Sequence, residues 1–207
     1  MDRKDGIIMI KKVVKAPLWT NTYANPAQYP WLDTNITCDV AVVGGGIAAA
    51  LCALRFAEAG MQTVLLSATP VGHGSTAVSS GILSLTGEDS FTCLVDKIGA
   101  ERALDAISLM EEAIGNIEKL CNGFEGQGIP GGNCGFRRLV SLRYTVNEQA
   151  EGRIRQEYSL QLHNGFVAEL LSPITASSQF TFPMAAGVYT KGAAGQVDPY
   201  RLVHAVT

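Results

Sequence analysis

The stretch from Cys38 to Ser67, CDVAVVGGGIAAALCALRFAEAGMQTVLLS, constrains the fold more than any other part of the chain. Residues 39–43 form an apolar, β-branched run that predicts a buried parallel strand. Three glycines follow, and residues 47–59 then have the composition of a helix that ends near Gly60. Residues 61–66 form a second apolar run. This order predicts a β-α-β unit with the glycines at the strand-to-helix turn.

The glycines stand where a dinucleotide-binding turn needs them. Gly44 permits a tight turn, and a side chain at Gly46 would hold a pyrophosphate away from the backbone. The third small position of the G-x-G-x-x-G/A pattern is Ala49, which still lets the helix pack closely on the strand. The helix then offers its unpaired N–H groups and the positive end of its dipole to phosphates. A glycine pattern can also serve only as a tight turn, so the flanking strand and helix are what favour dinucleotide binding.

The end of the second strand departs from that pattern. An acidic residue there normally hydrogen-bonds the adenosine ribose, and this chain has Ser67. A hydroxyl lacks the charge-assisted strength of a carboxylate. A missing acid is also compatible with a cofactor that carries a 2′-phosphate. Residues 68–81 hold no Lys or Arg to pair with such a phosphate, only His73, so a phosphorylated nicotinamide cofactor is disfavoured.

Composition excludes several classes of partner. The chain has 207 residues, 47% apolar and 17% charged, which is typical of a globular protein. A formal net charge of −3 argues against nucleic acid or an anionic membrane as the main partner, and no stretch has the apolar length of a membrane span. No secretory signal is evident, so we expect a cytoplasmic protein with buried, reduced thiols at Cys38 and Cys52. Its five cysteines and three histidines lack metal-ligand spacing.

The chain divides into four predicted parts. Residues 1–37 form an N-terminal arm with Trp19, Tyr23 and Trp31 as apolar anchors. Residues 38–130 form the first part of a Rossmann-like α/β domain. Residues 131–190 start an antiparallel-sheet substrate domain. Residues 191–207 return to the first domain, beginning a helix with Asp198 as N-cap and Pro199 as its first residue. The chain stops at Thr207, inside that predicted helix, which suggests a truncated protein.

The segments between these landmarks show further patterns. The Gly/Ser/Thr-rich loop after Ser67 predicts a second, ligand-facing cradle, although a solvent loop is the alternative. Residues 89–121 predict one amphipathic helix, and the glycine-rich stretch 122–135 predicts a break. Residues 148–162 predict another helix. Strands are predicted over 136–146, 166–171 and 179–190, and the first of these carries Arg137, Arg138 and Arg143. An arginine fork suits a substrate carboxylate, but exposed strand charges are the simpler interpretation of each one.

Three stretches together resemble the N-terminal half of an FAD-dependent oxidoreductase of the D-amino-acid oxidase/glycine oxidase superfamily. They are DVAVVGGGIAAALCALRFAEAGMQTVLL, GHGSTAVSSGIL and GQVDPYRLVHAV. The leader PLWTNTYANPAQYPWLDTNITCDV is similar to that of the γ-glutamylputrescine oxidoreductase-like subgroup of bacterial amine oxidases. The resemblance implies FAD on the Rossmann-like domain and an antiparallel sheet over the substrate side of the flavin. It also implies oxidation of the C–N bond of an amine or amino acid by hydride transfer to FAD, with O₂ or another electron acceptor.

The resemblance implies cofactor contacts from the turn, the end of the second strand and the second loop. The residues are Val43, Gly44, Gly45, Gly46, Ile47, Ala48, Ala49, Ser67, Ala68, Gly74, Ser75, Thr76, Ser79, Ser80 and Gly81. Thr76 is followed by Ala77 and Val78, and His73 precedes the motif. Attachment of FAD through a histidine after a GSTW-like sequence is therefore not supported, and non-covalent FAD is expected.

The family's C-terminal half, which supplies much of the active site, has no counterpart in the chain. Catalytic residues are therefore not assigned, and a missing half or a completing subunit is an expected partner. Two alternatives stay open. Ser67 is compatible with a degenerate, non-catalytic nucleotide-binding fragment, and the glycine turn alone is also compatible with an NAD(P)-dependent dehydrogenase.

Overall fold

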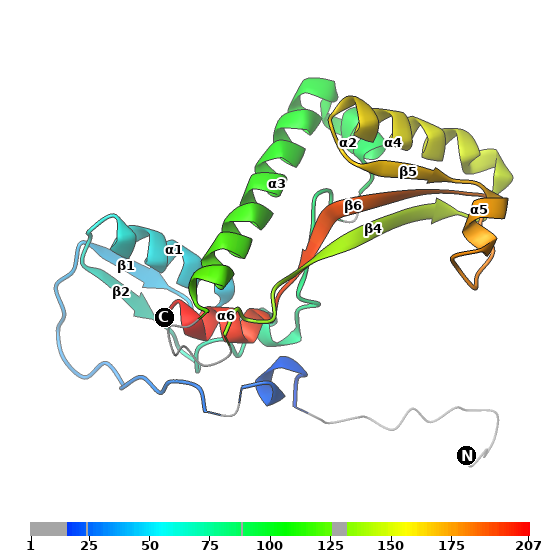
Figure 1. The fold of residues 1–207 in the computed structure, drawn as a ribbon. Helices are drawn as coiled ribbons and strands as arrows, with labels where there is room; N and C mark the ends of the chain where they lie inside the picture. The colour runs from blue at the N-terminus through cyan, green and yellow to red at the C-terminus, as the bar shows by residue number, and fades with distance from the viewer. Residues whose placement is uncertain (1–15, 24, 88, 126–131) are drawn as a thin grey trace, which may run out of the picture.

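Two sheets organise the protein in a computed structural model that describes residues 16–23, 25–87, 89–125 and 132–207 (Figure 1). The first is a parallel pair of β1 (Val40–Val43) and β2 (Thr63–Leu66). The second is antiparallel and is centred on the long β6 (Ala186–Gln196). β4 (Arg137–Thr145) pairs along β6, while β3 (Ile82–Ser84) and β5 (Ala168–Leu171) pair with different halves of it. The predicted α/β class with both kinds of sheet is confirmed.

The predicted β-α-β unit is present. α1 (Ile47–Glu58) connects the two parallel strands, which pair from Val40 opposite Thr63 to Val43 opposite Leu66. The prediction that these strands are buried is wrong, because neither contains a buried residue and Val43 is 82% exposed. A two-stranded sheet covered by one short helix leaves most of its surface open. For the same reason Cys52 on α1 is exposed and Cys38 is only half-buried.

The antiparallel sheet is covered on one face by helices (Figure 1). The predicted single helix over 89–121 is in fact α2 (Phe91–Ile98) and α3 (Ala100–Gly123). Gly99 separates them with a φ of +84°, a conformation that other residues adopt only with strain. Met110, predicted to belong to the buried stripe of this segment, is 43% exposed. The stripe that is buried consists of Ala103, Ile107, Ile114 and Cys121.

For the remaining helices and strands, the predicted type is more often correct than the predicted bounds. α4 (Glu151–His163) follows the short η3 (Glu148–Ala150), as predicted, whereas α5 (Pro173–Ser177) was not predicted. The strand expected over 179–190 begins at Ala186 and continues to Gln196. α6 (Pro199–Ala205) ends before Val206, so the expectation that the chain stops inside this helix is wrong. The predicted break at 122–135 lies partly outside the described residues. Two further single turns are η1 (Trp19–Asn21) and η2 (Ser75–Val78).

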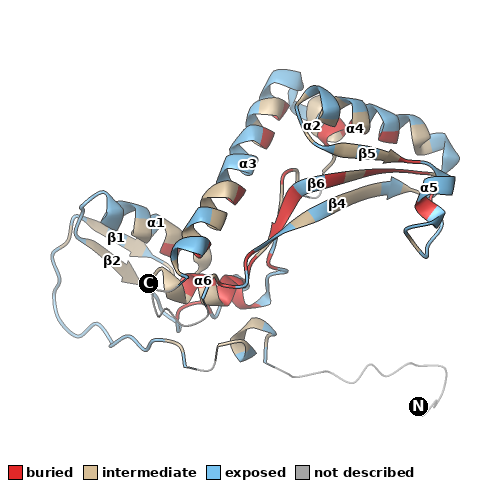
Figure 2. Ribbon diagram, in the orientation of Figure 1, coloured by how far each residue is buried: buried red, intermediate tan, exposed pale blue. Residues whose placement is uncertain are grey.

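The core lies where β6 and α6 meet α3. Figure 2 shows buried residues along β6, α6 and the inner side of α3, while the arm, β1 and β2 are intermediate or exposed. Ile107 and Ile114 of α3 pack in one cluster with Phe136, Val197 and Leu202. The antiparallel sheet and its helices therefore supply most of the buried apolar surface, and the β-α-β unit is attached through α6.

Asp198 connects three segments: α6, the arm and the turn before β4. Its side chain caps the helix by accepting hydrogen bonds from Tyr200 N and Arg201 N, both at 3.0 Å, as predicted for an N-cap. The same carboxylate accepts from Thr22 Oγ1 of the arm at 2.5 Å. The Asp198 backbone N–H donates to Cys134 O, which ties α6 to the turn before β4. Asp198 is only 6% exposed, so these bonds are shielded from water.

We expect Asp198→Ala to lower the free energy of unfolding by about 2–4 kcal/mol, because two helix N–H groups and the Thr22 hydroxyl lose their acceptor in a buried position. Urea denaturation followed by far-UV circular dichroism measures this. Asp198→Asn is the matched control, since asparagine is also a good N-cap, and its loss should be about 1 kcal/mol. Equal losses in the two variants would show that the capping oxygen is not what stabilises this junction.

Candidate dinucleotide-binding site

The turn between β1 and α1 has the geometry that the glycine pattern predicts. Gly44 has a φ of +134°, which favours glycine, and its N–H donates to Leu66 O at the end of β2 at 2.7 Å. Gly46 is the N-cap of α1 and has an extended backbone. A Cβ at Gly46 would contact only Thr76 Oγ1, at 3.3 Å. The fold itself therefore does not require glycine at position 46, since a small side chain would need only a slight shift of Thr76. Close approach of a ligand to the backbone is the remaining reason for glycine there.

The first turn of α1 presents free N–H groups. Ala50 N makes the first helical bond, to Gly46 O at 3.0 Å. Ile47 N donates instead to the hydroxyl of Thr76 in the second loop, at 3.0 Å. Among the described residues no partner is found for the N–H groups of Ala48 and Ala49, as expected in a first helical turn. With no acidic side chain in that turn, the positive end of the helix dipole is open to an anion.

Gly45 is required by the fold, a requirement that was not predicted from the sequence. A Cβ at this position would lie 2.3 Å from Ser67 Oγ and 2.9 Å from Ser67 Cβ. The turn and the end of β2 are therefore in direct contact. Ser67 Oγ donates to Thr69 O at 2.6 Å, so this hydroxyl can act only as an acceptor toward a ligand. No short motif signals this requirement, because it depends on a neighbouring strand.

The structure brings the second predicted loop against the turn. Gly72 N donates to Gly45 O at 2.8 Å, and Gly72 packs so closely on α6 that a Cβ would lie 2.8 Å from the Tyr200 ring. Thr76, in η2, is 5% exposed and reaches α1 as described above. Further along, the Ser79 and Ser80 hydroxyls accept from backbone N–H groups of the same loop. Gly74, Ser75, Ser79 and Ser80 are exposed and Gly81 is buried.

The arm fastens the far end of this loop. Trp19 Nε1 donates to Ser79 O at 2.7 Å, and the Trp19 ring would be 2.9 Å from a Cβ at Gly81. Tyr23 lies against His204, with ring centroids 5.7 Å apart. These two predicted anchors contact the body of the protein. The third, Trp31, is 88% exposed, so its prediction as an anchor is wrong.

A groove of about 650 Å³ opens beside β2, between α1, α6 and the arm. This volume is in the range of small-molecule sites. Ser67 and Ala68, both predicted to contact the cofactor, lie on its wall together with Val71. The turn adjoins this groove, because Gly45 lies against Ser67 and Val71, which both line it.

Two histidines and a tyrosine line the inner end of the groove. Tyr200 Oη and His73 Nε2 are 3.2 Å apart, and the Tyr200 ring stacks edge-on against His204 at 4.6 Å. Both His204 ring nitrogens are buried and find no hydrogen-bond partner among the described residues. Burial, and secondly the charge of His73, lower the pKa of His204, while burial raises the pKa of Tyr200. This cluster was not predicted, because the residues are distant in sequence.

The three arginines of β4 have different surroundings. Arg137 donates to Gln196, and Arg138 forms an ion pair with Glu118 at 2.7 Å. Arg143 points into a separate cavity between the sheet and the helices. No group of three or more His, Cys, Asp or Glu side chains in the described part of the chain is placed to hold a metal ion. Within the same residues, no helix is long and apolar enough to span a bilayer.

Replacing Thr76 with valine should lower the free energy of unfolding by about 1–2 kcal/mol, because the shape is retained while Ile47 N–H loses its acceptor. Urea denaturation of the purified chain gives the value. Thr76→Ser keeps the hydroxyl and serves as the control, with a loss below that of the valine variant. If the serine variant were the less stable of the two, packing of the methyl group and not the hydrogen bond would hold the two loops together.

The protein should become less stable as the pH falls below about 6.5, the ordinary pKa of an unfolded histidine. Because the pKa of His204 is lowered in the folded state, the unfolded chain takes up this proton first, and acid shifts the equilibrium toward unfolding. His204→Gln should flatten the dependence of the unfolding midpoint on pH between 7 and 5, measured by thermal melts. A slope unaltered by His204→Gln would contradict this assignment.

The chain is similar in sequence or in fold to several known proteins. The chain is 34% identical over 84 residues to γ-glutamylputrescine oxidoreductase of Escherichia coli, a match that covers 41% of this chain and 19% of that enzyme. Glycine oxidase from Geobacillus kaustophilus superposes with a TM-score of 0.61 at 19% identity, covering 82% of this chain and 43% of that one. L-α-glycerophosphate oxidase from Mycoplasma pneumoniae, solved with FAD bound, gives 0.58 at 15% identity, covering 83% and 42%.

The chain therefore spans less than half of the relatives that it matches. The structural matches, at these identities, show a shared fold. The family model of the FAD-dependent oxidoreductases of the DAO type matches residues 39–207, which include the glycine turn, the second loop, the antiparallel sheet and α6. This chain belongs to the DAO family of FAD-dependent oxidoreductases.

Proposed function

We propose that this chain is the cofactor-binding portion of a flavin-dependent oxidoreductase that oxidises the C–N bond of an amine or amino acid. The observation that carries the proposal is the junction at the start of α1. There, a glycine turn and a second loop meet around unpaired N–H groups, next to a groove large enough for a nucleotide. The printed names of two relatives, an oxidoreductase of γ-glutamylputrescine and an oxidase of glycine, support the class of substrate.

The residues present fit a non-covalent FAD. The N–H groups of Ala48 and Ala49 and the dipole of α1 suit the pyrophosphate, and Gly44 and Gly46 leave the backbone uncovered. Ser67 and Ala68, on the wall of the groove, would contact the adenosine end of the cofactor. The exposed residues Gly74, Ser75, Ser79 and Ser80 of the second loop would contact the rest of the cofactor. When bound, FAD supplies the hydride acceptor, while the chain supplies position and charge complementarity.

The antiparallel sheet is proposed as the substrate side. Its face opposite α2 and α4 carries Val140 and Tyr144, which are 49% and 46% exposed. Tyr144 lies against Phe182, with ring centroids 4.9 Å apart. This apolar, aromatic surface is suited to cover a planar ring and exclude water. No catalytic acid or base is assigned, and O₂ is the simplest electron acceptor for such an enzyme.

FAD titration tests the proposal. We expect the chain to perturb the absorption and quench the fluorescence of FAD in a saturable manner, with weaker binding of NAD. Ser67→Glu should bind FAD about fivefold more tightly, since a charged acceptor is worth about 1 kcal/mol more than a hydroxyl. Ser67 is exposed at the groove, so the longer side chain has room to reach a ribose.

Ser67→Ala is the matched control and should bind FAD no more tightly than the unaltered chain. If neither the unaltered chain nor Ser67→Glu binds FAD, the proposed cofactor site is refuted. The degenerate nucleotide-binding module, which the serine at position 67 favours, would then be the better description. Tighter binding of NAD than of FAD would support a nicotinamide-dependent dehydrogenase instead.

A further inference from the structure

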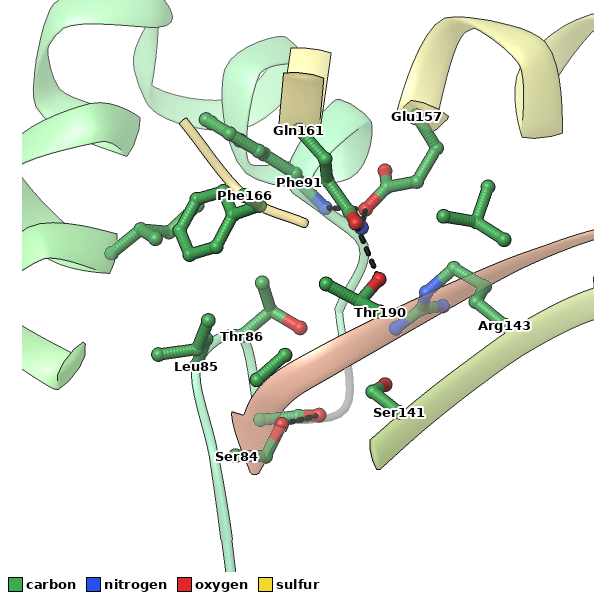
Figure 3. Close-up of a pocket in the computed structure, with 14 residues that line it drawn as sticks. Ser84, Leu85, Thr86, Phe91, Ser141, Arg143, Glu157, Gln161, Phe166 and Thr190 are labelled. Atoms are coloured by element: carbon green, nitrogen blue, oxygen red, sulfur yellow. Dashed lines mark hydrogen bonds between the residues drawn. The ribbon is translucent and has the colours of Figure 1, made fainter. Parts of the chain in front are cut away.

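A second cavity of about 110 Å³ lies between the antiparallel sheet and the helices that cover it (Figure 3). Its walls come from β4, β6, α4 and the segment that follows β3. It shares no residue with the glycine turn or with the groove beside β2. The volume is several times what one water molecule needs. The polar side chains on its wall are Ser84, Thr86, Ser141, Arg143, Glu157, Gln161 and Thr190.

On one wall of the cavity, the side chains of Glu157, Gln161 and Thr190 are linked by hydrogen bonds to one another and to the start of α2. Glu157 is 2% exposed, and its carboxylate accepts from Phe91 N at 3.1 Å and Thr92 N at 2.9 Å, at the start of α2. Gln161 Nε2 donates to the same Oε1 that Phe91 uses, at 3.0 Å. Thr190 Oγ1 in turn donates to Gln161 Oε1. The remaining acceptor position on this wall is at Glu157 Oε2, which has one protein partner while Oε1 has two.

The opposite wall has a cation with unused donors. Arg143 Nη2 donates to Asp89 O, but no carboxylate lies within 4 Å of the guanidinium in the described part of the protein. Its Nε and Nη1 groups donate to no described atom. Ser141, two residues earlier on the same face of β4, also has a hydroxyl without a partner among the described residues. By contrast, Arg138 is paired with Glu118, and Arg137 with Gln196.

We propose that this cavity binds a small carboxylic acid, with its carboxylate on the Arg143 fork and the Ser141 hydroxyl. The fork geometry of a guanidinium matches a carboxylate, and a partly buried cation gains most from such a partner. Glu157 Oε2, with one protein partner, is the acceptor available to an ammonium group on the same ligand. We therefore expect a small amino acid such as glycine to bind more tightly than acetate. The site is independent of the proposed flavin function.

The register of β4 explains why Arg143 alone takes this role. β4 pairs with β6 through Leu139 opposite Ala194 and then Ser141 opposite Thr190, with an irregularity between them. This shift places Ser141 and Arg143 on the helix-covered face with Thr190 and Val188. Because Arg143 also holds Asp89 O just before α2, a ligand here would connect β4 to the start of that helix.

Titration of the ¹⁵N-labelled 207-residue chain with glycine, acetate and glycinamide, followed by NMR, tests the proposal. Glycine and acetate should give saturable shifts at the amides of Phe91, Ser141 and Thr190, with glycine the tighter ligand. Glycinamide has no carboxylate and should give none. Arg143→Gln should weaken glycine binding at least tenfold, whereas Arg137→Gln, on the same strand but paired with Gln196, should leave it unchanged.

Ser141→Ala keeps the Arg143 side chain and its bond to Asp89, so it tests the ligand contact without risk to the fold. It should weaken glycine binding several-fold. The carboxylate site is refuted if neither acid gives saturable shifts, if glycinamide shifts the same amides, or if Arg143→Gln titrates like the unaltered chain. Equal affinities for glycine and acetate would refute the contact with Glu157.

Discussion

The hydrogen bonds of Asp198 are the constraint on which the geometry of the candidate cofactor site depends. The carboxylate starts α6, and α6 places Tyr200 and Val203 against Gly72. Gly72 in turn donates to Gly45 O in the turn after β1. A buried capping residue in the larger core therefore sets the position of the backbone that would approach a pyrophosphate. The same carboxylate also accepts a hydrogen bond from Thr22 of the arm. Three residues earlier in the arm, Trp19 donates to Ser79 O of the second loop.

This dependence matters because the β-α-β unit has little core of its own. β1 and β2 contain no buried residue, and α1 buries only Ala50. A unit with so few buried contacts is expected to open more easily than the antiparallel sheet, where Val188 and Leu171 are almost fully buried. A dinucleotide that bridges α1 and the second loop would stabilise this unit by binding only its folded form. The cofactor would then act as part of the structure as well as part of the chemistry.

Local patterns in the sequence were sufficient for some of these features. The run of valines, the three glycines and the Asp-Pro pair predicted β1, the turn and the start of α6, because strand, turn and cap preferences act over a few residues. The break between α2 and α3 at Gly99 was not predicted. It depends on the positive φ of Gly99, and a glycine between two amphipathic runs is equally compatible with one continuous helix. The need for glycine at position 45 and the face on which Arg143 lies depend on Ser67 and on a register shift in β4. Ser67 follows another strand, and the shift arises in the pairing of β4 with β6, so no pattern along one segment contains either cause.

Ser67 is best understood from the geometry around it. Its hydroxyl hydrogen is used by Thr69 O, so only its lone pairs are available to a ligand, and it retains the acceptor role that a carboxylate has at this position. What is lost relative to an acid is charge and reach. Gly45 lies so close that even one carbon there would collide with the serine side chain. The small pair of residues lets the turn and the end of β2 approach each other. In the proposed site, a weaker ribose contact would thus accompany a tighter junction between the turn and the end of β2, and affinity for a dinucleotide would rest mainly on the pyrophosphate end.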